Sequence, residues 1–191
     1  MIRSRKVLPI ASAMAVIVIG VVGCASAVSS PPPQSTAAPS TGEPQSASDP
    51  AAQAQAQAWL DAAALPSGAV RSQSSPFAFS SYTGWVCEPV EELEAFWTIP
   101  NMTVAAAANW LMSNPTGDLV TTAVGPWPDD QDIDGVTVGY TPADGTYQGV
   151  VYTLARMDDG VAVRAEVAAL TDSAVCATPP GGGTWGAPGQ G

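Results

Sequence analysis

Apolar side chains recur at helical spacing in two segments of the first half of the chain. Residues 51–64 carry Trp59 as their main apolar landmark, and residues 104–113 place Trp110 and other apolar residues on one face. This spacing predicts two amphipathic helices. The first helix also has a start signal, because Asp49 can accept hydrogen bonds from the first turn and a proline follows it directly.

The second half of the chain changes to a period of two, in which apolar and polar residues alternate. The alternating segments are residues 119–124, 136–141, 150–154 and 161–167. This pattern predicts four β-strands, each with one buried face.

Two hairpins are predicted to connect the last three of these strands. The turn Asp159-Gly160 has the composition preferred in two-residue hairpin loops, and it sets Leu154 opposite Ala165. The loop before it needs an odd length and a left-handed glycine, because only then does Val138 lie opposite Tyr152 on the apolar face.

Together these elements predict one α+β domain over residues 51–178. We expect an antiparallel sheet of about four strands with two or three helices packed on one face, the third helix being a short one over residues 90–96. Residues 24–50 are rich in Ser, Ala, Pro, Thr and Gln, which predicts a disordered tether. Residues 179–191 are rich in Gly and Pro, which predicts a disordered C-terminal segment.

The N-terminus has a basic head, an apolar run and a small residue just before Cys24. This layout resembles the lipobox signal of bacterial lipoproteins. The resemblance implies removal of residues 1–23, a lipid on the Cys24 sulfur and a place on the extracytoplasmic face of the cell membrane. Two alternatives remain: an ordinary signal cut near Ala25-Ser26-Ala27, and an uncleaved transmembrane helix. The apolar run over residues 7–22 is shorter than the ~20 residues that a spanning helix needs.

Charge narrows the classes of partner and of chemistry. The chain has 6 basic and 17 acidic residues, no His and a net charge of −11. Removal of residues 1–23 leaves three basic residues, and the net charge becomes 3 − 17 = −14. Such a charge argues against nucleic acid or phosphate-rich partners. Without His, and with no Lys after that cleavage, a Ser-His or Ser-Lys pair cannot form, so we expect no enzyme of this kind.

Two cysteines remain after Cys24. In an exported protein, an even number of remaining cysteines is most simply explained by a disulfide, here between Cys87 and Cys176. Two separate buried thiols are the alternative.

Three carboxylates alternate before a glycine in the segment that precedes the second predicted strand. Asp130, Asp132 and Asp134, followed by Gly135, resemble the opening of an EF-hand calcium loop. The pattern departs from that family at its twelfth position, where Thr141 stands in place of a bidentate Glu. A solvated acidic loop is the alternative, and calcium is the one cofactor that the sequence suggests.

A second acidic cluster contains Glu88, Glu91, Glu92 and Glu94. A pair such as Glu91 and Glu94 can serve as acid and base in glycoside hydrolysis, which makes a cell-wall glycan hydrolase an alternative function. Carboxylates at the start of a helix also stabilise the helix dipole, and this explains the cluster without catalysis.

Tryptophans give one further indication of binding. Trp127 and Trp185 lie in segments rich in Pro and Gly, where an exposed ring can stack on a sugar or contact a protein partner.

Three motifs resemble a group of uncharacterised actinobacterial secreted lipoproteins over most of residues 59–176. They are Phe96-Trp97-Thr98-Ile99-Pro100, Ala108-Asn109-Trp110-Leu111 and Asn114-Pro115. The resemblance implies a location and a fold but no activity. We therefore expect a lipid-anchored, non-enzymatic envelope protein that binds or assists an extracytoplasmic partner, an envelope protein or a glycan. A glycan hydrolase and a calcium-stabilised binding domain are the alternatives.

Overall fold

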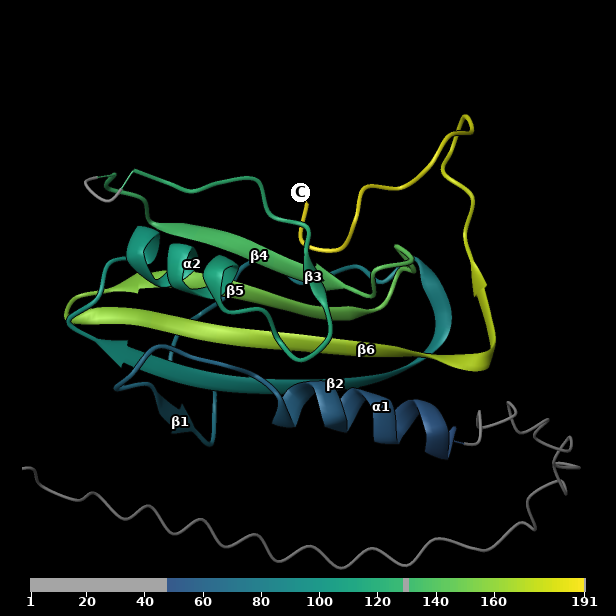
Figure 1. Ribbon diagram of the computed structural model, residues 1–191, viewed down its shortest axis with the longest axis horizontal. Coiled ribbons are helices and arrows are strands. Elements are labelled where there is room, and N and C mark those ends of the chain that lie inside the picture. The colour runs from purple at the N-terminus through teal and green to yellow at the C-terminus, as the bar shows by residue number, and fades with distance from the viewer. Residues whose placement is uncertain (1–47, 129–130, 191) are drawn as a thin grey trace, which may run out of the picture. The chain divides into compact units, whose positions relative to one another are not determined.

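The computed structural model describes residues 48–128 and 131–190. Within them, six strands form one antiparallel sheet in the order β1-β2-β6-β5-β4-β3 (Figure 1). The elements in chain order are α1 (Pro50–Asp61), β1 (Val70–Ser72), β2 (Cys87–Pro100), α2 (Val104–Ser113), β3 (Val120–Thr121), β4 (Gly135–Thr141), β5 (Gly149–Met157) and β6 (Gly160–Cys176).

The predicted fold class is wrong. In place of about four strands with two or three helices on one face, the described part of the chain has six strands and two helices and is mostly β. The main error lies at residues 90–96, which belong to β2 and not to a third helix. Ala95, Trp97 and Ile99 are buried at alternate positions, and β2 pairs with β6 along almost its whole length. Burial and pairing outweigh the helix propensity of the glutamates here.

Both predicted helices are confirmed, and they pack onto the sheet. Asp49 caps α1 by accepting from the backbone N–H groups of Ala51 and Ala52, and Thr103 caps α2. Helix α1 contacts β2 and β6, whereas α2 contacts β4 and β5. The core lies between the helices and the sheet, where odd-numbered residues of β2 and β6 meet even-numbered residues of β4 and β5.

Two tyrosines fasten α2 and the segment after it to the sheet. The buried rings of Tyr140 and Tyr152 pack edge to face, with centroids 5.8 Å apart. The Tyr140 hydroxyl donates to the Leu111 carbonyl, and the Tyr152 hydroxyl lies 2.8 Å from Thr116 Oγ1. Burial raises the pKa of both phenols, that of Tyr152 to about 12.

The two hairpins differ in how well the sequence predicts them. Val138 does lie opposite Tyr152, and Gly145 in the loop between them has a left-handed φ of 76°. In the next hairpin Leu154 lies opposite Val163, not Ala165. This shift of two residues leaves every side chain on its predicted face.

The shift arises because Gly160 belongs to the ladder and not to the turn. It is the first residue of β6 and pairs with Met157. A Cβ at Gly160 would collide with the Ile99 carbonyl oxygen of the neighbouring strand. The glycine therefore permits close approach of β2 and β6.

The second face of the sheet, away from the helices, is covered by two irregular segments. We call residues 73–86, between β1 and β2, the strap, and residues 177–190, after β6, the tail. The strap is held through Thr83, whose backbone N–H donates to the Glu166 carboxylate over 2.9 Å. The tail forms no helix or strand, but its Gly189 carbonyl accepts from Thr137 Oγ1 on β4 over 2.8 Å.

Candidate functional site

A cavity of about 330 Å³ lies on the second face of the sheet between the strap and the tail. Thr137, Val151 and Thr153 line it from the sheet, and Tyr147 lines it from the β4–β5 loop. Its walls are strap residues 81–84 and 86 and tail residues 185–190. None of the lining residues carries a charge. We call this cavity the strap–tail pocket.

Arg164 on β6 holds the strap against the sheet. Its guanidinium lies 4.9 Å from the ring centre of Phe79 and 4.1 Å from that of Tyr82, and the residue is only 1% exposed. Nη2 donates to the Ser81 carbonyl and, over 2.8 Å, to the Glu166 carboxylate. One buried cation thus contacts three strap residues.

Two carboxylates flank this cation. Glu94 lies directly opposite Glu166 across β2 and β6, and its Oε1 is 3.9 Å from Arg164 Nε. Glu166 also accepts from Thr83, through the backbone N–H and the hydroxyl. Side by side, the two carboxylates would repel each other, so the arginine between them stabilises the pair.

The tail is held mainly through its own backbone carbonyls. Thr122 Oγ1 donates to the Pro188 carbonyl over 2.9 Å, next to the Thr137–Gly189 bond. Gly139 on β4 allows this approach, because a Cβ there would collide with the Pro188 carbonyl oxygen. A Cβ on Gly189 would in turn lie 2.8 Å from Gly139 Cα. The tail therefore packs directly against the backbone of β4 at Gly139, where no side chain intervenes.

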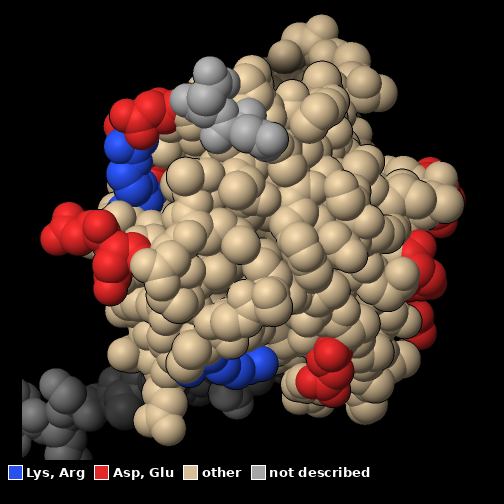
Figure 2. Space-filling model, turned by 60° about the vertical axis from the view of Figure 1, so that its left-hand side comes forward, with Lys and Arg blue, Asp and Glu red and all other residues tan. Residues whose placement is uncertain are grey.

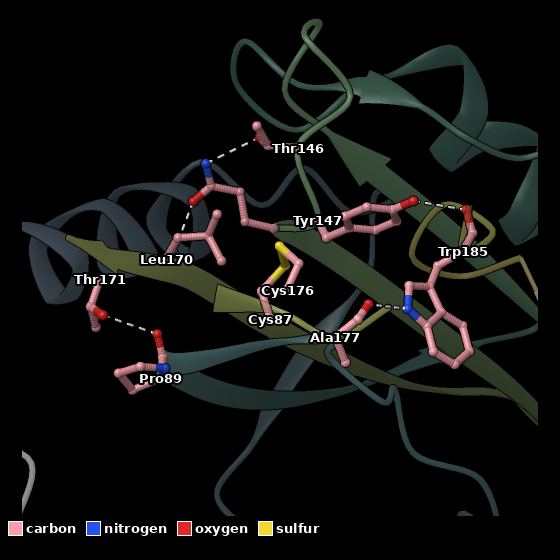
Figure 3. Close-up of a disulfide and its surroundings, with 10 residues drawn as sticks. Cys87, Pro89, Thr146, Tyr147, Leu170, Thr171, Cys176, Ala177 and Trp185 are labelled. Atoms are coloured by element: carbon pink, nitrogen blue, oxygen red, sulfur yellow. Dashed lines mark hydrogen bonds between the residues drawn. A yellow bond between two sulfur atoms is a disulfide. The ribbon is translucent and has the colours of Figure 1, made fainter. Parts of the chain in front are cut away.

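Two aromatic residues join the rim of the pocket to the root of the tail (Figure 3). The Tyr147 hydroxyl donates to the Trp185 carbonyl over 2.9 Å, and Trp185 Nε1 donates to the Ala177 carbonyl over 2.6 Å. Trp185 remains 36% exposed.

The predicted disulfide between Cys87 and Cys176 is confirmed. It joins the first residue of β2 to the last residue of β6, so the strap ends and the tail begins beside it (Figure 3). The pairing continues one residue further, where the Ala177 N–H donates to the Val86 carbonyl over 2.8 Å. The end of the strap and the beginning of the tail are thus both attached to the same disulfide.

The predicted calcium ligands lie apart from this pocket. Asp130 is outside the described residues, and Asp132 and Asp134 both face Arg156. Asp134 Oδ1 is 3.3 Å from Arg156 Nε, and the side chains of the two aspartates are 85% and 97% exposed. Across residues 48–128 and 131–190 no group of three or more His, Cys, Asp or Glu is placed to hold a metal ion. Calcium binding stays a prediction.

The carboxylates of the hydrolase alternative point away from each other. Glu91 and Glu94 are three residues apart in β2 and therefore lie on opposite faces of the strand. Glu91 Oε1 accepts from the Asp49 N–H at the start of α1, whereas Glu94 faces Arg164. Glu92 is exposed but partly desolvated, which raises its pKa, and the charges of Glu166 and Glu88 raise that pKa further. The structure does not bring Glu91 and Glu94 to one cleft.

Five of the six tryptophans fall into three groups. Trp59 and Trp97 are buried in the core, and Trp110 packs against it half-buried. Trp127 is half-buried and exchanges backbone hydrogen bonds with the side chain of Asn109. Of the two that the sequence places in loops, only Trp185 lines the pocket.

Charged side chains lie mainly at the margins of the face shown in Figure 2. Its centre carries neither sign, and the blue patches at its edges have red ones beside them. Among the described residues, Arg156 is paired with Asp132 and Asp134. That face therefore presents no cluster of basic residues for a polyanion.

Comparison with protein-family models, with curated proteins and with solved structures finds no match for this chain. The resemblance to actinobacterial lipoproteins stays a prediction. Cys24 and residues 1–23 lie outside the described residues. In the part of the chain that the structure describes, no helix combines the length and apolarity that a membrane span requires.

Proposed function

We propose that this chain is a lipid-anchored, extracytoplasmic binding module whose ligand site is the strap–tail pocket. The observation that carries the proposal is a preformed cavity with an uncharged lining, held open by structure on both sides. Its volume of about 330 Å³ falls within the ~300–1,000 Å³ typical of small-ligand sites.

The chemistry of the lining favours binding over catalysis. The pocket presents hydroxyl, amide, aromatic and backbone groups, but no Asp, Glu, Cys or Arg. A general acid or base must lie within hydrogen-bond reach of its substrate. Arg164 and Glu166 lie behind the strap, where they are occupied with each other and with strap residues.

The disulfide supports the proposed location. Disulfides persist in oxidising compartments outside the cytosol, which is where a lipid on Cys24 would hold the mature chain. A net charge of −14 after cleavage weakens adsorption to anionic lipid, so the anchor itself has to provide the attachment.

Blocking the pocket tests the binding role. Ala187 lines the pocket and has no side-chain hydrogen bond to lose, whereas Thr178 is exposed on the same tail and does not line it. A panel of small neutral, cationic and anionic compounds is screened by ligand-observed NMR. We expect at least one compound to bind both the wild type and the control variant Thr178→Phe. Ala187→Phe should weaken their binding at least tenfold. No binder at all, or equal binding by both variants, would overturn the proposal.

Removing the anchoring cysteine tests the location. Cys24→Ala should move the protein from the membrane fraction to the medium, while Ser26→Ala, two residues further on, should leave it in the membrane. Fractionation of intact cells and labelling with a fatty-acid analogue measure this. Membrane retention of Cys24→Ala would contradict the lipid anchor.

A further inference from the structure

Two of the three threonines that line the strap–tail pocket, Thr83 and Thr137, have already used their hydroxyl donors. Thr83 Oγ1 donates to Glu166 Oε2 over 3.0 Å, and Thr137 Oγ1 donates to the Gly189 carbonyl over 2.8 Å. A hydroxyl has one proton but two acceptor lone pairs. Toward a ligand, these two side chains therefore present lone pairs only.

Two of the three aromatic residues that line the pocket, Tyr147 and Trp185, repeat this pattern. The Tyr147 hydroxyl donates to the Trp185 carbonyl, and Trp185 Nε1, which is the only donor on its ring, donates to the Ala177 carbonyl. Figure 3 shows both bonds directed within the protein. The ligand that suits such a lining is one that brings its own O–H or N–H donors.

Charge argues for a neutral ligand. The nearest cation is Arg164, which lies against the ring of Tyr82 and has Nη2 3.4 Å from Thr153 Oγ1, both of them pocket residues. A cationic ligand would find no carboxylate in the lining to pair with, because Glu166 is already paired with Arg164. An anion would face a chain of net charge −11 and a pocket in which the side-chain donors of Thr83, Thr137, Tyr147 and Trp185 are already used.

Three aromatic residues, Tyr82, Tyr147 and Trp185, give the pocket flat apolar surfaces. A neutral molecule that has several hydroxyl donors and one flat C–H face is a sugar ring. The cavity of about 330 Å³ lies at the small end of the range for ligand sites, which limits the ligand to one or two rings.

We propose that the strap–tail pocket binds a neutral saccharide of one or two rings, with Trp185 as a stacking platform. This inference rests on the pocket being the binding site of the proposed function. It adds the class of ligand and the residue that recognises it.

Calorimetric titration tests the inference with N-acetylglucosamine, its β-1,4-linked dimer, maltose and trehalose as neutral probes. Choline and glutamate serve as charged probes of similar size. At least one saccharide should bind the wild type, and Trp185→Ala should weaken it about tenfold because the stacking surface is lost. Trp185→Phe should stay within about threefold of the wild type, since a flat ring is kept.

Trp85 provides the matched control. It lies in the strap between two pocket-lining residues but does not line the pocket itself. Trp85→Ala should therefore leave saccharide binding within about twofold of the wild type. A thermal melt of each variant shows whether a loss of binding reflects a loss of fold.

The outcomes separate this inference from the proposed function. Saccharide binding that depends on Trp185 and is blocked by Ala187→Phe supports both. If only choline or glutamate binds, and Ala187→Phe blocks that binding, then the saccharide inference is wrong but the proposed binding function is supported. Saccharide binding that Ala187→Phe does not affect places the sugar elsewhere and overturns the inference. Failure of these probes and of the wider panel to bind overturns both.

Discussion

Arg164 is the residue on which the closed strap depends. It occupies a polar position in a strand whose alternation the sequence shows clearly, and such a position normally faces water in an antiparallel sheet. Here the strap covers that face, so the arginine is buried between Phe79 and Tyr82. The alternation predicts which face the side chain takes, but it contains no information about what lies on that face.

Arg164→Met tests this role, because methionine keeps an unbranched stem and removes the charge. Glu94 and Glu166 are then left opposite each other without a cation between them. Loss of one partner from a buried ion pair costs about 3–5 kcal/mol, and we expect the free energy of unfolding in urea to fall toward the lower end because Glu94 is partly exposed. Arg71→Met, at an exposed arginine, is the control and should cost less than about 1 kcal/mol. Equal losses in the two variants would contradict the role of Arg164.

Glu92 gives a prediction about pH. Its pKa is raised by desolvation and then by Glu166 and Glu88, so the folded protein holds this proton more tightly than the unfolded chain does. That contribution to stability is complete below the unfolded pKa and is lost as the pH rises through the folded pKa. Glu92→Gln should therefore raise the melting temperature at pH 7 by about 1–2 °C and leave it unchanged at pH 3.

The wild type, melted at the same two pH values, supplies the reference for the pH experiment. A Glu92→Gln variant that gained stability at pH 3 and lost it at pH 7 would show the opposite sign and refute the assignment.

At the level of elements, the sequence correctly predicts the helices and strands in which apolar residues recur at a regular period. Both helices, the strands around Val138, Tyr152 and Val163, and the register of the β4–β5 hairpin follow from that period. Strand β2 is missed because glutamates crowd its first half, where they favour a helix and hide the alternation. Strand β1 has three residues and carries no periodic signal of its own.

Gly139 is the position where the contact between tail and sheet can be broken most selectively. Gly139→Ala inserts a Cβ where the Pro188 carbonyl now lies, so we expect the tail to leave β4 while the core stays folded. Limited proteolysis should then cut the tail at least fivefold faster, and the fluorescence of Trp185 should shift to longer wavelength. Gly84→Ala is the control, because a Cβ there meets nothing within 4 Å. Unchanged proteolysis of Gly139→Ala would mean that the tail does not depend on this contact.

At the level of the whole molecule, the pocket is built from the parts of the chain that are hardest to interpret. Strap and tail are held by backbone carbonyls such as those of Ser81, Pro188 and Gly189, and a carbonyl is common to every residue type. From the sequence only Trp185 and the cysteine pair could be assigned to this region. Tyr82 and Tyr147 carry no local signal that distinguishes them from other loop tyrosines.

The disulfide should contribute strongly to global stability, since it closes a sequence separation of 89 residues. The chain-entropy model gives about 4.5 kcal/mol for such a loop, and measured values commonly reach 2–4 kcal/mol. We expect a variant with Cys87→Ser and Cys176→Ser to lose about 2–4 kcal/mol in urea unfolding. A reductant should lower the wild type to that level and leave the variant unchanged. Equal stability of oxidised and reduced wild type would contradict the prediction.

The position of the Cys87–Cys176 bond also has a consequence for timing. It joins the end of the strap to the start of the tail, so we expect a newly made chain whose thiols are still reduced to hold these two segments less firmly. If the chain is exported as proposed, full ligand binding should follow oxidation of this pair outside the cytosol. A copy still inside the cell would then compete less well for the same ligand.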